Sequence, residues 1–268
     1  MMQHTSLAAA SAVSAPWRWA LAGVLAGLLV APVVFAPARW LAALVGQASG
    51  EHVLLAAPRG GFWQGSAQLV LSGGAGSRDA VALPGQLHWR IRPAGLGLQV
   101  QLNADCCMQQ ALQLQVMPAG WGGVQLALAD SQSLWPAALL TGLGTPWNTV
   151  QAQGRLAAST QGLNVRWAQG RLSLDGRMQL DAAQVSSRLS TLQPMGSYRL
   201  LLQGGNPSTL QLSTLEGRLQ LTGQGQWAGE RLRFEGTASA TPESVDALSN
   251  LLNIIGRRNG ATAIFKVG

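Results

Sequence analysis

The 268-residue sequence is poor in the side chains that most chemistry needs. Only 11% of its residues are charged, and it has three histidines, two cysteines and one tyrosine. The histidines at 4, 52 and 88 have no Cys, Asp or Glu partners at metal-ligand spacing, so no metal site is predicted. Gly-x-Ser-x-Gly and Gly-rich phosphate loops with a following Lys are absent. These absences argue against an enzyme and predict no catalytic residue and no cofactor.

Charge of one sign is also not concentrated anywhere. Lys and Arg together number 18 against 11 Asp and Glu, giving a net charge of +7. The arginines are scattered singly and do not form the basic stripe that binds nucleic acid. A nucleic-acid partner is therefore not expected, whereas attraction to anionic lipid headgroups and simple solubility are equally good uses of this charge.

What the sequence does contain is a two-residue alternation of apolar and polar side chains. It is clear in Leu96–Leu102, Leu112–Val116, Arg171–Leu174 and Gly217–Leu221. Residues two apart in a strand share a face, so each segment presents one apolar and one polar face. With 33 glycines and 12 prolines to make turns, the pattern predicts a mainly β chain with one large antiparallel domain over residues 66–268.

We expect this domain to be a single, strongly curved sheet, because Gly122, Gly154, Gly176 and Gly236 fall inside expected strands, where glycine permits bends. A two-sheet sandwich is the main alternative. The expected strands are Ala67–Ser72, Gln86–Ile91, Leu96–Leu102, Ala111–Met117, Val124–Ala129, Thr149–Leu156, Leu163–Trp167, Arg171–Leu180, Ser197–Leu202, Thr209–Leu215, Arg218–Thr222, Arg231–Ala238 and Ala261–Val267.

Three soluble helices are expected beside the strands. Arg39–Gly50 is compatible with a helix, and Ser133–Leu140 suggests a short one with Pro136 at its first position. The clearest is Thr241–Ile255, whose apolar positions share one face and whose ends carry Pro242 and Gly256. We expect it to pack at one end of the sheet.

The amino-terminal region predicts a membrane anchor. Residues 17–36 are apolar apart from Arg18, which is enough for a helix to cross the hydrocarbon core. Trp17 and Trp19 at one end and Trp40 at the other suit the headgroup level. A cleaved signal peptide ending at Val34-Phe-Ala36 is the alternative.

The anchor suggests a topology for the whole chain. We expect residues 1–16 to be a cytoplasmic tail, 17–36 a single transmembrane anchor in the inner membrane, 37–65 a periplasmic connector, and 66–268 a periplasmic β domain. The positive-inside signal is nearly balanced, with Arg18 and Arg39 on opposite sides of the apolar run.

Cys106 and Cys107 are adjacent in an expected turn. Neighbouring Cα atoms lie about 3.8 Å apart, closer than a relaxed disulfide prefers. A vicinal disulfide, two free thiols and an intermolecular bridge all stay open.

Several segments together resemble a known family. They are Gly61-Phe-Trp-Gln-Gly65, Leu189–Tyr198, Gly217–Gly229, Leu232–Ala238 and Leu251–Gly260, in that order behind one anchor. In order and spacing they are similar to the type II secretion system protein N family. The resemblance implies an inner-membrane protein with a periplasmic β domain, an accessory part of the machine that exports folded proteins through an outer-membrane secretin. It implies no catalytic residues, and it nominates the secretin and other inner-membrane secretion subunits as partners.

Two functional classes therefore stand. The first is an interaction subunit of the secretion machinery, with exposed arginines such as Arg218 and Arg231 as a possible interaction surface. The second is a periplasmic lipid-handling protein, because a long curved sheet has a concave apolar face that can shield acyl chains from water.

Overall fold

The computed structural model describes residues 17–120, 122–228 and 231–267. The chain divides into two compact units, residues 1–36 and residues 37–268. The first contains helix α1 (Trp17–Val34), which has Pro32 within it and no buried residue. By length and composition α1 could cross a membrane.

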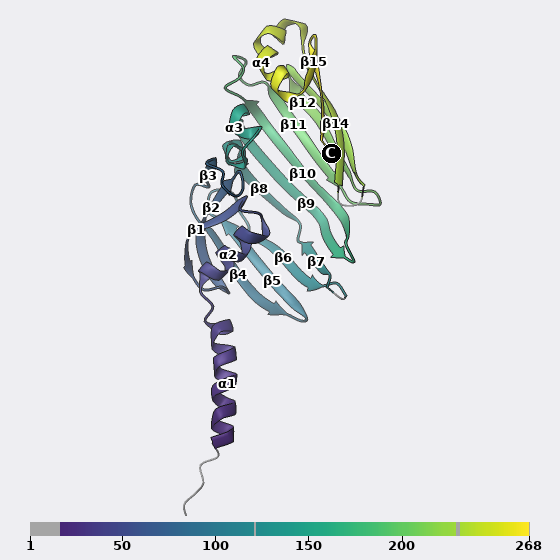
Figure 1. Cartoon of the computed structure of the whole chain (residues 1–268). Helices are drawn as coiled ribbons and strands as arrows, with labels where there is room; N and C mark the ends of the chain where they lie inside the picture. Colours follow the sequence, from purple (N-terminus) through teal and green to yellow (C-terminus); the bar gives the residue numbers. More distant parts are fainter. Residues whose placement is uncertain (1–16, 121, 229–230, 268) are drawn as a thin grey trace, which may run out of the picture. The chain divides into compact units, whose positions relative to one another are not determined.

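The second unit is built on one antiparallel sheet of sixteen strands (Figure 1). Fourteen strands follow one path, β1-β2-β4-β5-β6-β7-β9-β10-β11-β12-β13-β14-β16-β15, with β3 beside β2 and β8 beside β9. The bounds are β1 Val53–Gly60, β2 Gln64–Ser72, β3 Ala80–Ala82, β4 Leu87–Ala94, β5 Gly97–Ala104, β6 Leu112–Pro118, β7 Val124–Leu128, β8 Ser131–Pro136, β9 Gln153–Ala168, β10 Arg171–Ser186, β11 Gly196–Gln203, β12 Thr209–Gly217, β13 Leu219–Ala228, β14 Arg231–Ala240, β15 Arg257–Asn259 and β16 Thr262–Val267. The expected single sheet is confirmed.

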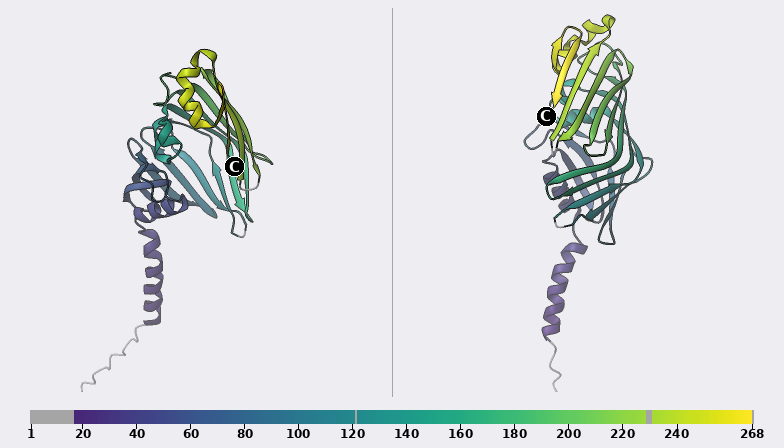
Figure 2. Two further views of the ribbon diagram at one scale, coloured as in Figure 1. Left: turned by 45° about the horizontal axis from the view of Figure 1, so that its top comes forward. Right: turned by 90° about the vertical axis from the view of Figure 1, so that its right-hand side faces the viewer.

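The sheet formed by the described strands is strongly bent (Figure 2). The longest pair, β9 and β10, has a register shift between Asp175 and Arg177. Gly176 occupies this bulge with φ +85°, and a Cβ there would collide with the carbonyl oxygen of Gly162 on β9. Only glycine fits both the dihedral and the space. Gly122, by contrast, lies in the turn between β6 and β7, not inside a strand.

Helices pack on the sheet at three places. The smallest core lies around Ala137, Ala152 and Leu156, where the segment 137–150 packs against β9 and β10. The first core joins α2 (Ala38–Ala48) to the strands β1, β2, β4 and β5 around Leu83 and Trp89, and includes Leu139 of the 3₁₀ helix η1 (Ala137–Leu143). The second core joins α4 (Val245–Ile255) to β13, β14 and β16, through the fully buried Leu248 and Leu252. Short elements α3 (Trp147–Val150) and η2 (Pro242–Ser244) complete the helical part.

Three segments differ from the sequence-based expectation. Residues 131–136 form strand β8 along β9, and Pro136 precedes the 3₁₀ helix instead of starting an α-helix. Residues 257–259, which also lie outside the expected strands, form β15 beside β16. Residues 53–60, which lie outside the expected strands, form β1, and β1 pairs with β2 over Val53–Gly60.

Candidate functional site: an apolar groove on the sheet

One face of the sheet is apolar from strand to strand. Because residues opposite each other in register share a face, the apolar positions can be followed across the strands. Val100 faces Leu114, which faces Leu128; farther along, Leu180 faces Leu200, which faces Leu212. The helix cores use the same face, since Val100 packs in the first core and Leu212 in the second.

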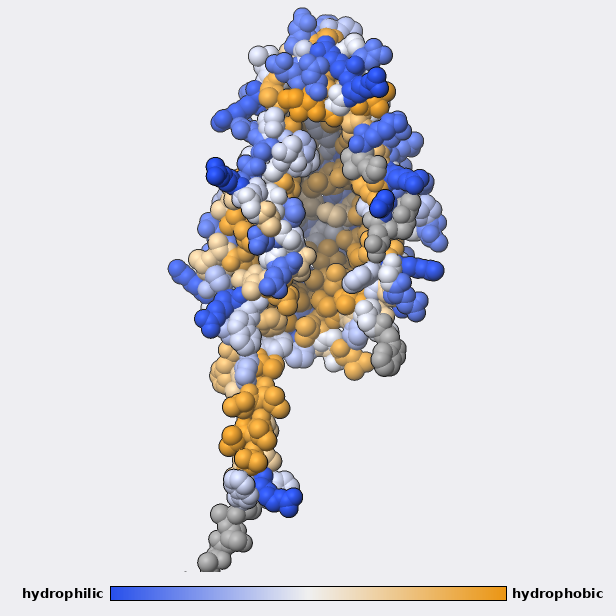
Figure 3. All heavy atoms as spheres, viewed as in Figure 1, coloured by the Kyte–Doolittle hydropathy of each residue, from blue (hydrophilic) through white to orange (hydrophobic). Residues whose placement is uncertain are grey.

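Between the first and second cores this apolar face is open. We call the following residues the groove floor; all are half-buried and belong to none of the three cores: Leu112, Leu114, Val116, Leu126, Leu128, Val165, Leu174, Met178, Leu200, Leu202 and Leu210. The space-filling view shows a deep hollow with an apolar lining at this position (Figure 3). No described element covers the groove floor.

At the tips of the strands the apolar face becomes more exposed to solvent. Val124, Trp167 and Leu172 face one another in register across β7, β9 and β10. Their exposed fractions are 40%, 53% and 43%, which is high for side chains of this size. We call these three residues the groove mouth. They continue the alternation of the groove floor, since Val165 and Leu174 are two positions away on the same strands.

The opposite face is polar. Arg199 binds Asp181 through two hydrogen bonds, Nε to Oδ1 at 2.7 Å and Nη2 to Oδ2 at 2.8 Å. The bonded guanidinium lowers the pKa of Asp181, and the carboxylate raises the pKa of Arg199. Charged side chains therefore lie on the face away from the groove, and the groove floor itself contains none.

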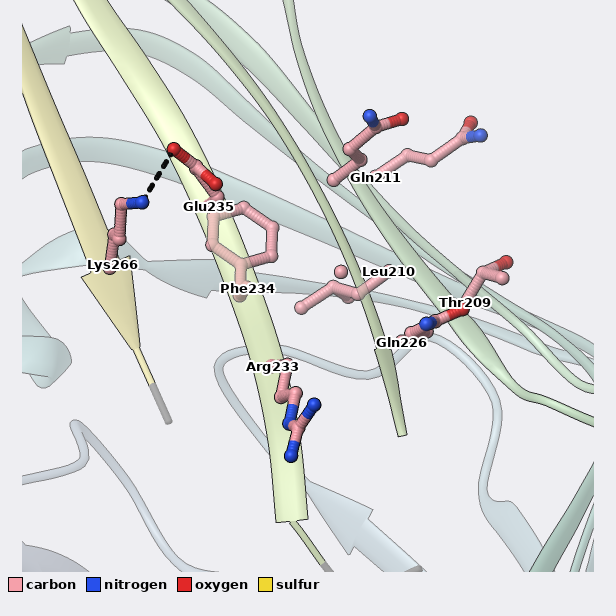
Figure 4. A pocket seen from close by; sticks show the side chains of 10 residues that line it. Thr209, Leu210, Gln211, Gln226, Arg233, Phe234, Glu235 and Lys266 are labelled. Atoms are coloured by element: carbon pink, nitrogen blue, oxygen red, sulfur yellow. Dashed lines mark ion pairs between the residues drawn. The ribbon is translucent and has the colours of Figure 1, made fainter. Parts of the chain in front are cut away.

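A shallow pocket of about 580 Å³ lies over β12, β13, β14 and β16. Figure 4 shows Gln211 on β12 and both Arg233 and Glu235 on β14, with Lys266 of β16 paired to Glu235 at 2.9 Å. Both partners of that ion pair are largely exposed. The lining residues of this pocket include no Ser, Cys or His.

The described residues contain no group of three or more His, Cys, Asp or Glu that could hold a metal ion. His88 contacts Asp105 at 3.3 Å in an exposed position, and Nδ1 of His52, in the tautomer that carries a proton there, donates to the carbonyl oxygen of Ser49 at 2.9 Å. His4 lies outside the described residues. Tyr198 is buried, donates its hydroxyl to the carbonyl of Leu219, and has its pKa raised by that burial.

The two cysteines lie in the turn between β5 and β6. The sulfur atoms of Cys106 and Cys107 are 2.07 Å apart, at bonding distance, with the Cα atoms 3.7 Å apart. Cys107 is buried in the first core, whereas Cys106 is exposed. The vicinal disulfide stays a prediction, tested below.

The predicted membrane-interface tryptophans are all exposed. Trp17 and Trp19 lie in the first turn of α1, and Trp40 lies on α2 in the second unit. Exposure is what an interfacial tryptophan requires.

The two predicted interaction arginines are not brought together. Arg218 precedes β13, and Arg231 begins β14, so the length of β13 separates them, about 30 Å at the rise of a strand. Both are exposed, and no ion pair among the described residues holds either one. They are two separate sites on the surface, not one patch.

Sequence reasoning located the apolar face but missed the groove mouth. The sequence contains a signal for the groove mouth, because Trp167 and Leu172 continue the apolar–polar alternation to the ends of their strands. No local sequence pattern indicates that the face is open between the cores, because this depends on where α2 and α4 pack on the sheet.

The family model of the type II secretion system protein N matches residues 51–264, nearly all of the second unit. No curated protein and no solved structure matches the chain. The match covers well over half of the chain, in agreement with the order of segments in the sequence, and we conclude that the chain belongs to the type II secretion system protein N family, whose members are accessory components of that secretion machinery.

Proposed function

We propose that the chain is a non-enzymatic accessory subunit of type II secretion, anchored in the inner membrane by α1, with the sheet in the periplasm. The observation that carries the proposal is the family match over residues 51–264. The exposed apolar helix α1 supports the anchoring, because a helix of this composition with no buried residue needs an apolar surrounding. In this role the subunit contacts the secretin or other inner-membrane components during export of folded proteins.

The sheet offers two places for such a contact. β1 and β15 are the end strands of the path, and an end strand has main-chain groups free to accept a strand from a partner. β15 has only three residues, whereas β1 has eight, so β1 provides the longer edge. Arg218 and Arg231 would add attraction to a moderately acidic partner, with modest effect because both are exposed.

The proposal is tested by capture from the cell envelope. Residues 37–268, which form a compact unit, are attached to beads and exposed to a detergent extract of envelopes from the same cells. We expect recovery of the secretin or of an inner-membrane secretion subunit. Arg218→Glu and Arg231→Glu, made separately because the sites are distant, should each be compared with the unmodified unit.

Arg92→Glu is the matched control, because Arg92 is equally exposed but lies on β4, far along the sheet from both sites. A weaker capture by only one of the two test variants would identify the contacting end of β13. Equal losses in all three variants would indicate nonspecific charge attraction. Recovery of no secretion component above empty beads would contradict the proposed role.

A further inference from the structure

We propose that the groove floor binds the acyl chains of phospholipids, which enter at the groove mouth. This lipid site goes beyond the secretion role and does not depend on it. It rests on the open apolar face between the first and second cores, which no described element covers.

The chemistry of the groove floor selects an apolar occupant. Its side chains are aliphatic apart from the thioether of Met178, and none is charged. A continuous apolar surface of this kind is unfavourable in water and marks a binding surface. The first and second cores show that the same face is buried wherever the chain supplies a cover, as α4 does over Leu212 and Leu221.

An acyl chain suits the groove better than a peptide. The strands that carry the floor, such as β6, β10 and β11, each have a bonded strand on both sides, so their main-chain groups are already paired. The side chains of the floor offer no hydrogen-bond partner either. An extended peptide would lose water from its own N–H and C=O groups without replacement, which costs free energy, whereas an acyl chain has no such groups.

The size of the groove agrees with lipid. The floor crosses six neighbouring strands from β6 to β12, and five spacings of about 4.8 Å give an arc of about 24 Å. Each leaflet of a hydrocarbon core of about 30 Å is about 15 Å thick, which is about the length that one acyl chain spans. The floor is therefore long enough to hold a whole acyl chain.

The groove mouth has the composition of a membrane interface. Trp167 is an amphipathic ring of the type that sits at headgroup level. Arg166 and Arg171 precede Trp167 and Leu172 in the β9–β10 hairpin, so they lie at the same rim but on the polar face; both are exposed, and no ion pair among residues 17–120, 122–228 and 231–267 holds them. Unpaired guanidinium groups on long side chains at a rim that also carries an exposed tryptophan are complementary to lipid phosphate.

The test uses the full chain in its own cells. A photo-crosslinking residue, p-benzoylphenylalanine, replaces Leu200 in one strain and Leu201 in another. These neighbours on β11 are matched, since Leu200 faces Leu180 and Leu212 in the groove, whereas Leu201 faces Gln179 and Gln211 on the polar side. After irradiation, adducts are identified by the mass added to the peptide that carries the probe.

We expect phospholipid adducts at position 200, and at least about tenfold fewer at position 201, because neighbouring strand residues point to opposite faces. The same adducts should form in cells that lack the other secretion components, which separates this inference from the proposed function. Adducts of another protein or of a second copy at position 200 would overturn the proposal, and so would equal lipid labelling at the two positions.

A second measurement covers the case in which the probe disturbs folding. Leu200→Gln and Leu201→Gln are purified as full chains, compared by circular dichroism, and extracted for bound phospholipid. Among variants that fold alike, Leu200→Gln should retain several-fold less phospholipid than Leu201→Gln, because an amide in the floor would be buried against acyl chains. Equal phospholipid in both folded variants would contradict a site in the groove.

Discussion

At the scale of single residues, the ion pair between Arg199 and Asp181 gives the protein one pH-dependent contribution to stability. The pKa of Asp181 is lowered in the folded state, so the carboxylate stabilises the fold above its unfolded pKa, near 3.9, and this contribution is lost as the pH falls through the lowered folded value. Both side chains are partly exposed, so solvent screening limits the effect.

We therefore expect Asp181→Asn to lower the free energy of unfolding at pH 7 by about 0.5–1 kcal/mol, with the difference from the wild type shrinking below about pH 4. Urea unfolding of residues 37–268 at several pH values measures it. Asp175→Asn is the control, because Asp175 lies on the same strand and face, is exposed, and enters no ion pair among the described residues. Equal effects of the two substitutions at every pH would show that the Arg199 contact contributes nothing specific.

The cysteine pair provides a second prediction at this scale. If Cys106 and Cys107 are bonded to each other, the unfolded protein should have no titratable thiol without reductant and two after reduction. Ellman titration in denaturant, with non-reducing electrophoresis to detect dimers, distinguishes the three states left open by the sequence. Two thiols without reductant would exclude the vicinal bond, and a reductant-sensitive dimer would indicate an intermolecular one.

At the scale of elements, α4 is held by one face only. Leu251 is 1% exposed in the second core, whereas Ile254, one turn away, is 41% exposed. We expect Leu251→Ala to lower the free energy of unfolding by about 2–5 kcal/mol, because it leaves a cavity, and Ile254→Ala to change it by less than about 0.5 kcal/mol. Urea unfolding followed by tryptophan fluorescence measures both. Similar losses for the two would mean that α4 does not bury the face described.

How much of each element could be predicted depended on whether its signal was local. Strands β10 to β14 follow from alternation alone, and the α4 helix follows from its apolar periodicity and flanking Pro242 and Gly256. β1 carries no alternation in Val53-Leu-Leu-Ala-Ala57, so its place beside β2 is set by tertiary pairing. β9 was expected as two strands, because Gly162 interrupts a pattern that in the structure continues through a bulge.

The groove could likewise be predicted only where its sequence signal is local. The apolar face was predictable, since each strand specifies which of its side chains point together. The uncovered middle of this face was not predictable, because it depends on how far the helices that cover the face extend. α2 and α4 are short, at eleven residues each, and they cover only the ends of a face that crosses many strands.

At the scale of the whole molecule, the remaining question is whether residues 1–36 stay attached. A signal peptide would be removed at about residue 36, releasing the sheet, whereas an anchor would keep the full 28.0 kDa chain in the membrane fraction. We expect the anchor, because the apolar helix spans eighteen residues, longer than the usual signal core, and Pro37 directly follows the candidate cleavage site.

Intact-mass measurement and alkaline extraction of membranes test this prediction together. We expect the full mass, and we expect the chain to resist extraction with carbonate, while a chain whose apolar segment 17–36 is replaced by the cleavable signal of a periplasmic protein should be extracted.

Protease added to spheroplasts should then digest the β unit, and protease added to intact cells should not, if that unit lies in the periplasm. A measured mass that lacks the first 36 residues would contradict the anchor. Any lipid adducts at Leu200 would then have formed on a protein that is not attached to the membrane.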